Sequence, residues 1–278
     1  MKVVCREIGE RDLDGVADCL ARNFPRRSRA FFRRWLADLA GSPRFGHLIE
    51  ADGRVVGALI EIVHASILDG APPPRCNFSS WCVDPPFRGF ALALPKQALR
   101  DAGVTYLNLT PAPHTLRSLE ALRFARYAEG AVLAAPLLSP AVAHARLIRF
   151  ECEAAEARGL SPWERAMLGD HARLGFDALI GVHDGAATPF VLKMWPLWRR
   201  FPPAAELVYA RSESDVAMFA RALGRHCLAK GRWRLIVSAN GPIAGLAGRF
   251  RPGRAPHYFR GPCPPATTDL AYTELIWL

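Results

Sequence analysis

The chain has 278 residues, half of them hydrophobic, and a formal net charge of +10. This length and apolar content suffice for one large or two ordinary domains, and they exclude a globally disordered chain. Prolines and charges interrupt the most apolar stretch, residues 130–148, so we expect no membrane span. We also expect no secretory leader, because Met1-Lys2 leads directly into the strand-like Val3-Val4-Cys5. The positive charge is mostly scattered arginine, with clusters at 26–29, 33–34 and 199–200 and no nucleic-acid-binding motif, so we expect a cytoplasmic protein without a nucleic-acid partner.

The first quarter of the chain alternates strands and helices. Residues 3–7 favour a strand, and the spacing of apolar residues predicts helices over 12–24 and 28–39. Two further strands, 47–51 and 54–63, flank the dipeptide Asp52-Gly53. Because Asp-Gly suits a type I′ turn, these strands are predicted to form a hairpin.

The most informative segment follows, at residues 77–94. It predicts a strand over 77–83, a proline-bounded turn, and a helix over 91–102. The start of a helix presents unpaired N–H groups and a partial positive charge, which together attract anions. Arg88 and Gly89 lie in the turn, where Arg88 adds a cation that matches phosphate geometry. The segment therefore predicts a phosphate or pyrophosphate site.

The rest of the first half continues the alternation. The pattern predicts a strand over 104–110, a short helix over 115–122 and one more strand over 124–133.

The second half repeats this plan. Ser161 and Glu164 form a capping box that opens a helix, and a second hairpin is expected around Asp184-Gly185, 132 residues after the first Asp-Gly turn. A strand (206–210), a long helix (213–229) and a strand (232–239) are predicted to follow. The strands that end at residues 110 and 239 lie 129 residues apart, and such similar spacing of unlike elements favours duplication.

The sequence Val83-Asp-Pro-Pro-Phe-Arg88-Gly-Phe-Ala91 resembles the acyl-CoA-binding signature of the GNAT superfamily, the GCN5-related N-acetyltransferases. That signature is an apolar strand ending in Val, a short loop, and Arg-Gly-x-Gly/Ala at the start of a helix. The element order of residues 1–135 is also that of a GNAT domain. A second matching piece, residues 114–124, is similar to the family's helix that ends in Leu-Gly-Phe, with Arg123 in place of the glycine.

The resemblance implies an α/β (α+β) fold, with a mixed central sheet flanked by helices and present as a tandem pair. The expected domains are 1–138, which binds acyl-CoA, and 139–278, a degenerate second copy. The second copy carries Glu213 and Asp215 where the first has its Arg-Gly turn, and these carboxylates would repel a phosphate.

The reaction implied is acyl transfer from acetyl-CoA or another acyl-CoA to a small-molecule acceptor, usually an amine. The residues that the resemblance assigns to the CoA thioester are the strand end and the turn: Val83, Arg88, Gly89, Phe90, Ala91 and Leu92. Backbone N–H groups near Val83 would polarise the acyl carbonyl, and the turn would hold the pyrophosphate. Catalysis then depends on positioning and on a base that takes the amine proton.

The general base is not fixed by the sequence. The family often places a carboxylate on the strand before the turn, where this chain has Asn77, Ser79 and Trp81. The remaining candidates are Glu61, His64 and His114. Each could instead have a structural role, and ordered water could replace a side-chain base. The tyrosine that the family commonly uses as an acid falls near a leucine here.

Two alternatives to a small-molecule N-acetyltransferase stay open. The chain could bind acyl-CoA without catalysis, because the usual acid and base are missing. It could also be a tandem-domain acyl- or aminoacyltransferase that acts on a peptide or a cell-envelope precursor. The seven cysteines are scattered and lack a Cys-x-x-Cys pair, so we expect neither a disulfide framework nor a metal site.

Overall fold

The computed structural model describes residues 1–40, 45–151, 155–196 and 203–276. The basic pair at 199–200 and Cys152 lie outside these residues. No helix within the described ranges is both long and apolar enough to cross a bilayer.

The strands and helices of the first half follow the predicted order. Its strands are β1 (Val3–Glu7), β2 (Gly46–Ala51), β3 (Arg54–His64), β4 (Arg75–Val83), β5 (Thr105–Asn108) and β6 (Ala125–Ala134). Its helices are α1 (Leu13–Asn23), α2 (Arg29–Leu39), α3 (Ala93–Ala98) and α4 (Leu116–Ala121), with short 3₁₀ turns η1 (Glu10–Asp12), η2 (Pro85–Phe90) and η3 (Pro113–Thr115).

The second half has a similar but not identical order of elements in its described residues, with one α-helix between its first two strands and no helix between its last two. Its strands are β7 (Arg146–Arg149), β8 (Asp177–His183), β9 (Ala186–Met194), β10 (Ala204–Ala210), β11 (Arg234–Ala239) and β12 (Gly248–Arg260). Its helices are α5 (Pro162–Arg173), α6 (Glu213–Met218) and α7 (Ala220–Ala229), with 3₁₀ turns η4 (Pro136–Leu138), η5 (Ala155–Gly159) and η6 (Glu274–Ile276).

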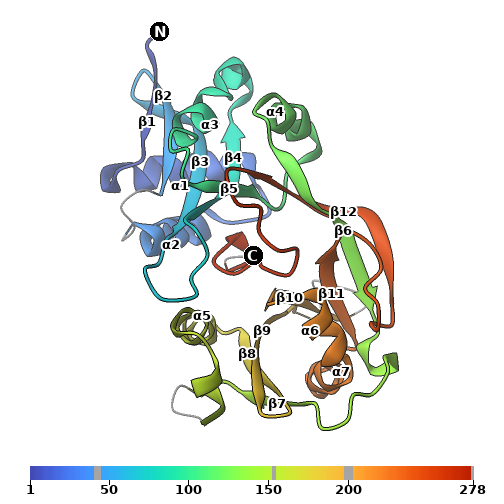
Figure 1. Ribbon diagram of the computed structural model, residues 1–278. Coiled ribbons are helices and arrows are strands. Elements are labelled where there is room, and N and C mark those ends of the chain that lie inside the picture. The colour runs from blue at the N-terminus through green and yellow to red at the C-terminus, as the bar shows by residue number, and fades with distance from the viewer. Residues whose placement is uncertain (41–44, 152–154, 197–202, 277–278) are drawn as a thin grey trace.

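The twelve strands of the described residues belong to one mixed sheet, in the order β1-β2-β3-β4-β5-β12-β6-β11-β10-β9-β8-β7. The halves exchange strands at its centre. The last strand of the second half, β12, pairs with β5, while β6 of the first half pairs with β11. Figure 1 shows the halves one above the other, joined by these long strands. Residues 248–260 therefore belong to the sheet of both halves, and the proposed boundary at 138/139 stays a prediction about sequence segments.

Local patterns explain most of the elements. Asp52 and Gly53 have φ of 45° and 83°, and Asp184 and Gly185 have φ of 48° and 76°, so both type I′ turns are confirmed. The capping box that opens α5 is also confirmed, since the Ser161 side chain accepts a hydrogen bond from the backbone of Glu164. The apolar faces of α1 and α2 cover one face of the first half-sheet, and α3 and α4 contribute to the core on the other.

Two predicted helices are wrong in length. The helix expected over 91–102 is the six-residue α3, which follows the 3₁₀ turn η2 and ends at Leu99, where φ and ψ are −77° and 26°. The helix expected over 213–229 is divided into α6 and α7 at Phe219, whose φ and ψ are −93° and 9°. Both halves nevertheless keep a mixed sheet flanked by helices, which confirms the predicted fold class.

Candidate active site

The first feature of the site is the divergence of β4 and β5, which we call the first splay. The two strands pair in parallel at three positions only, the last being Asn77 opposite Leu107. Beyond this point β4 stays paired with β3 but contains a bulge, because Ser79 lies opposite Ile60 and Cys82 opposite Ala58. Ser80, within the bulge, has a φ of 50°, which re-aims the backbone next to the opening.

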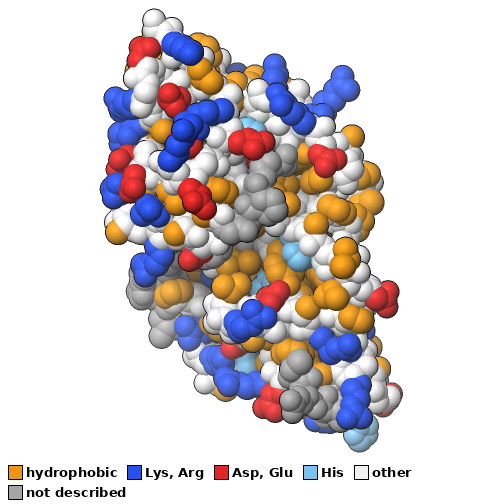
Figure 2. All heavy atoms as spheres, turned by 90° about the vertical axis from the view of Figure 1, so that its left-hand side faces the viewer, with side chains coloured by type: hydrophobic (Ala, Val, Ile, Leu, Met, Phe, Trp, Pro, Cys, Tyr) orange, Lys and Arg blue, Asp and Glu red, His pale blue; other side chains and the backbone are white. Residues whose placement is uncertain are grey.

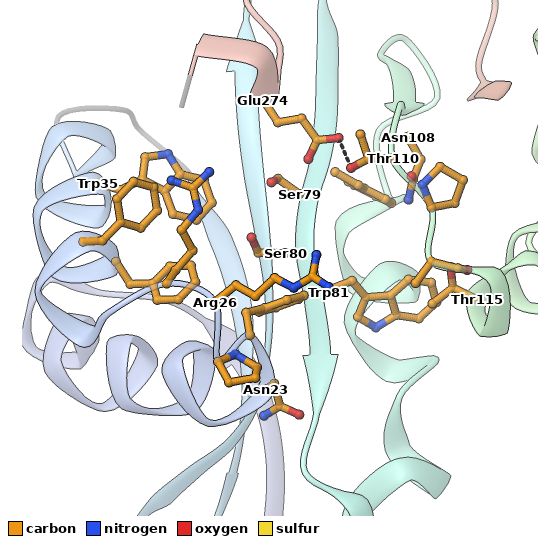
Figure 3. A pocket seen from close by; sticks show the side chains of 18 residues that line it. Asn23, Arg26, Trp35, Ser79, Ser80, Trp81, Asn108, Thr110, Thr115 and Glu274 are labelled. Atoms are coloured by element: carbon orange, nitrogen blue, oxygen red, sulfur yellow. Dashed lines mark hydrogen bonds between the residues drawn. The ribbon is translucent and has the colours of Figure 1, made fainter. Parts of the chain in front are cut away.

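A cavity of about 440 Å³ lies at the first splay. Its walls come from the loop between α1 and α2, from α2, from β4, and from the segment after β5 (Figure 3). Ser79, Ser80 and Trp81 of β4 face it, and Asn108, Thr110 and Thr115 lie on the other side. Its volume is that of a small-molecule site.

Glu274, which the sequence did not single out, enters this cavity from η6. The side chain is almost fully buried, with 4% of the residue exposed. Thr110 Oγ1 donates a hydrogen bond to Glu274 Oε1 at 2.6 Å, and the Ser79 hydroxyl also donates to the carboxylate. Burial raises the pKa of Glu274 above that of an ordinary glutamate, against the effect of these hydrogen bonds.

Glu274 is held in place by its neighbours in the C-terminal segment. Leu270 and Leu275 are buried in a hydrophobic cluster that includes residues of both halves, and Lys193 Nζ donates to the backbone carbonyl of Leu275. The only signal in the sequence is one carboxylate within the apolar residues Leu275-Ile276-Trp277-Leu278 and Ala271-Tyr272. That pattern cannot show which half the carboxylate reaches, so local reasoning missed it.

The structure does not bring Glu61 or His64 to the cavity. Glu61 is fully buried in β3, where its Oε1 lies 2.5 Å from His47 Nδ1. The His64 ring stacks on Tyr272 with the ring centroids 3.8 Å apart, and Trp163 Nε1 donates to His64 Nε2 at 3.3 Å. Burial and the nearby Arg75 lower the pKa of His64 to about 4.

His114 is nearer the cavity but does not line it. It is exposed in η3, between the cavity-lining residues Ala112 and Thr115. The catalytic roles of Glu61, His64 and His114 thus stay predictions, and the geometry supports each of them less than it supports Glu274.

The predicted phosphate turn lies at the end of β4. Val83 is buried, whereas Arg88, Gly89 and Phe90 are exposed in η2, followed by Ala91 and Leu92 before α3. Gly89 does not have a positive φ, and a Cβ placed there would contact nothing within 4 Å. Steric need therefore does not explain this glycine, and only the openness of the turn and the charge of Arg88 remain as reasons for an anion site.

Asp84 fixes the turn to α1. Its carboxylate accepts hydrogen bonds from Arg22 Nη2 and Asn23 Nδ2, both at 2.8 Å. The carboxylate is buried by these contacts, so it positions the backbone before Arg88 and is not available as a base for the cavity.

The second half has the corresponding divergence of β10 and β11, which we call the second splay. These strands also pair in parallel at three positions, ending at Glu206 opposite Ile236, and β10 has an irregularity before Tyr209. The whole arrangement recurs with an offset of 129 residues, so Val208–Ala210 corresponds to Ser79–Trp81.

The chain itself closes the second splay. Residues 268–270 run antiparallel to β10, with Ala210 N donating to Thr268 O at 3.0 Å and Leu270 N donating to Val208 O at 2.8 Å. The start of α6 is closed as well, because Glu213 accepts a hydrogen bond from the Thr267 hydroxyl at 2.9 Å. The backbone edge that lines the cavity in the first half is thus paired with protein in the second.

A scan against protein-family models finds no match, and neither does a search of curated proteins. The solved structures do give similar folds. A GCN5-related N-acetyltransferase from Anabaena variabilis has 12% identity and a TM-score of 0.61, covering 93% of this chain and 72% of that one.

Two further structures agree with it. A GCN5-related N-acetyltransferase from Kribbella flavida has 15% identity and a TM-score of 0.59, covering 93% of this chain and 71% of that one. A probable N-acyltransferase from Enterococcus faecalis has 12% identity and a TM-score of 0.58, covering 94% and 73%. The chain has the GNAT fold. At this identity the similarity establishes the fold alone, and the matches extend over both halves.

Proposed function

We propose that the protein is an acyl-CoA-dependent N-acyltransferase whose active site is the first splay. The observation that carries the proposal is a buried carboxylate, Glu274, in a small-molecule cavity beside a bulged, diverging strand of a GNAT fold. Acyltransferases of this fold need a gap between two strands for the thioester and a base for the acceptor amine.

The residues present fit a CoA thioester in the first splay. The pantetheine arm of CoA is extended and carries amide groups, so it can pair with a strand edge as a peptide does. The second splay supports this, because its equivalent edge pairs with the extended backbone of residues 268–270. We therefore propose that the edge of Ser79–Trp81 holds the arm, with the Arg88 turn near the pyrophosphate.

The proposed chemistry is direct transfer. A protonated amine that enters the cavity first gives a proton to Glu274. Because the pKa of Glu274 is raised, it lies closer to the pKa of the amine than that of an ordinary glutamate does. The nitrogen lone pair then forms a bond to the acyl carbon, and the carbon–sulfur bond breaks with its electron pair on sulfur. The nitrogen loses its second proton and the thiolate takes up one proton, so free CoA and an amide are the products, and Glu274 releases the first proton to solvent.

Two alternatives are favoured less. Non-catalytic binding would give no reason for a carboxylate in the cavity, since burying a carboxylate has a free-energy cost that its hydrogen bonds with Thr110 and Ser79 only partly offset. A peptide or cell-envelope acceptor would need an extended groove, whereas this cavity has the volume of a small-molecule site.

Calorimetric titration with acetyl-CoA tests the proposal. We expect one CoA per chain, because the second splay is closed. Gly89→Glu, which adds a negative charge at the turn, should abolish binding, whereas Glu213→Ala with Asp215→Ala should leave it unchanged. Absence of binding at millimolar acetyl-CoA, or two sites per chain, would contradict the assignment.

A further inference from the structure

The wall of the cavity opposite β4 is aromatic. Phe24, Phe31, Phe32 and Trp35 come from the loop after α1 and from α2. Their rings form a connected series, with centroids 6.2 Å apart for Phe24–Phe32, 5.4 Å for Phe31–Phe32 and 6.2 Å for Phe32–Trp35. Such a wall offers ring faces and edges to another aromatic group, which adds to the gain from burying apolar area.

The same cavity carries positive charge. Arg26 and Arg27 line it, and Figure 3 shows the Arg26 side chain extended across the middle of the opening toward Trp81. Arg27 lies over the Phe31 ring, with its Cζ 4.3 Å from the centroid. Among the described lining residues Glu274 is the one carboxylate, so a molecule with several positive charges would be repelled.

We propose that the acceptor is an amine that bears both an aromatic ring and a carboxylate, for example an aromatic α-amino acid. This inference rests on the proposed N-acyltransferase function and specifies its substrate class. Three separate features of one cavity carry it: an aromatic wall, a guanidinium over the opening, and a single buried carboxylate.

The three groups of such an acceptor match three parts of the cavity. The amine lies toward Glu274 and Ser79, next to the bulge of β4. The ring packs against the wall formed by α2. The carboxylate pairs with Arg26, which is exposed and can move to meet it. An amine without an acid group would leave Arg26 unpaired, and an amine without a ring would leave the aromatic wall in contact with water.

Calorimetry in the presence of CoA tests the proposal without requiring turnover. The probes are L-phenylalanine, phenethylamine (no carboxylate), L-alanine (no ring) and spermidine (a polycation). We expect L-phenylalanine to bind about tenfold or more tightly than either truncated probe, since phenethylamine lacks the charge-assisted hydrogen bond and L-alanine lacks the buried ring, each of which contributes about that factor. Spermidine should bind more weakly than phenethylamine.

Arg26→Ala provides the matched variant. It should remove the preference for L-phenylalanine over phenethylamine while leaving the affinity for phenethylamine unchanged. Arg34→Ala is the control, because Arg34 is an exposed arginine of α2 that does not line the cavity. That variant should keep the full preference.

The outcomes separate this inference from the proposed function. If acetyl-CoA binds but L-phenylalanine shows no advantage over phenethylamine and alanine, or if spermidine binds most tightly, the substrate class is wrong and the acyltransferase proposal stands. If Arg34→Ala removes the preference as fully as Arg26→Ala does, the carboxylate is not bound by Arg26. Absence of acetyl-CoA binding contradicts the proposed function itself.

Discussion

The two splays have the same strand arrangement, but the first is open to a cavity and the second is filled by the chain itself. In the first, residues 79–81 of β4 line a cavity, and in the second the equivalent residues 208–210 of β10 are hydrogen-bonded to residues 268–270. The same C-terminal segment then continues into the first half and places Glu274 in the open cavity. The recurring arrangement thus presents two equivalent edges, and the C-terminal segment pairs with one of them and places Glu274 beside the other.

The largest effect is expected when the carboxylate of Glu274 is removed. Glu274→Gln keeps the shape of the side chain but cannot take a proton, so we expect kcat for acyl transfer to fall by roughly 10²–10⁴-fold. Free-thiol release from acetyl-CoA measures the rate, and the affinity for acetyl-CoA should change little.

Glu213→Gln is the matched control from the second splay, and it should retain full activity. The pH profile sharpens the test. Because burial raises the pKa of Glu274, kcat should rise as this carboxyl loses its proton, at a pH above the ordinary value for glutamate. This rise of kcat with pH should be absent in Glu274→Gln. An unchanged rate in this variant would exclude Glu274 as the base.

The second effect concerns the attachment of the segment. Arg75 of β4 and Asp269 form a buried bidentate ion pair, with Nη1–Oδ2 at 2.9 Å and Nη2–Oδ1 at 3.1 Å. Asp269→Asn leaves the Arg75 charge buried and uncompensated, so we expect a loss of about 3–5 kcal/mol in the free energy of unfolding.

Urea denaturation measures this loss. The control is Asp14→Asn, which breaks the exposed pairs of Asp14 with Arg29 and Arg33 and should cost at most about 1 kcal/mol. Equal losses in the two variants would show that the segment is not held by Arg75.

The comparison of the splays was only partly accessible from the sequence. The two Asp-Gly turns and the 129-residue offset between strand ends revealed the repeat, because hairpins and strands depend on local pattern. From the sequence, Glu213 and Asp215 alone gave a reason to expect that the second half does not bind CoA. The stronger reason, residues 268–270 paired with β10, is a contact between distant segments that no periodicity encodes.

The exchanged strand β12 shows the same limit. Its sequence contains Pro252 and Pro256, which are unusual within a strand, and the structure accommodates them in an irregular stretch between Pro252 and His257. Glu274 was missed for a related reason. A single carboxylate in an apolar segment gains its meaning only from the strands of the other half that surround it.

The third effect is a loss of stability at low pH, where the contact between His64 and Tyr272 of the C-terminal segment weakens. The His64 ring stacks on Tyr272, and its Nε2 accepts a hydrogen bond from Trp163, so the neutral form is the one bound. Its pKa of about 4 lies below the unfolded value of 6.5, so the stabilisation is complete above pH 6.5 and is lost as the pH falls toward 4. Partial exposure reduces the effect, which we expect to be about 1–3 kcal/mol.

Urea denaturation of the wild type and His64→Gln at pH 7.5, 5.5 and 4.5 isolates this contribution. The difference between the two proteins should shrink as the pH falls, because only the wild type loses the neutral imidazole. His257, whose pKa burial also lowers to about 4, and Glu274 titrate in both proteins and therefore cancel. A difference that is constant over this range would contradict the link between His64 and the segment.

The smallest effect tests how the first splay holds an anion. In the first half the turn after β4 carries the exposed Arg88, while the corresponding turn after β10 leads into the acidic start of α6. Arg88→Ala should weaken the binding of acetyl-CoA by about 1 kcal/mol, less than a buried charge-assisted hydrogen bond contributes, because Arg88 is exposed. Because an exposed pair is screened, the loss should shrink at high salt. Gly89→Ala is the steric control and should bind normally, since its Cβ would meet open space. If Gly89→Ala weakened binding more than Arg88→Ala, the ligand would have to approach the backbone of the turn closely. The charge difference between the two splays would then not explain why only the first is expected to bind acetyl-CoA.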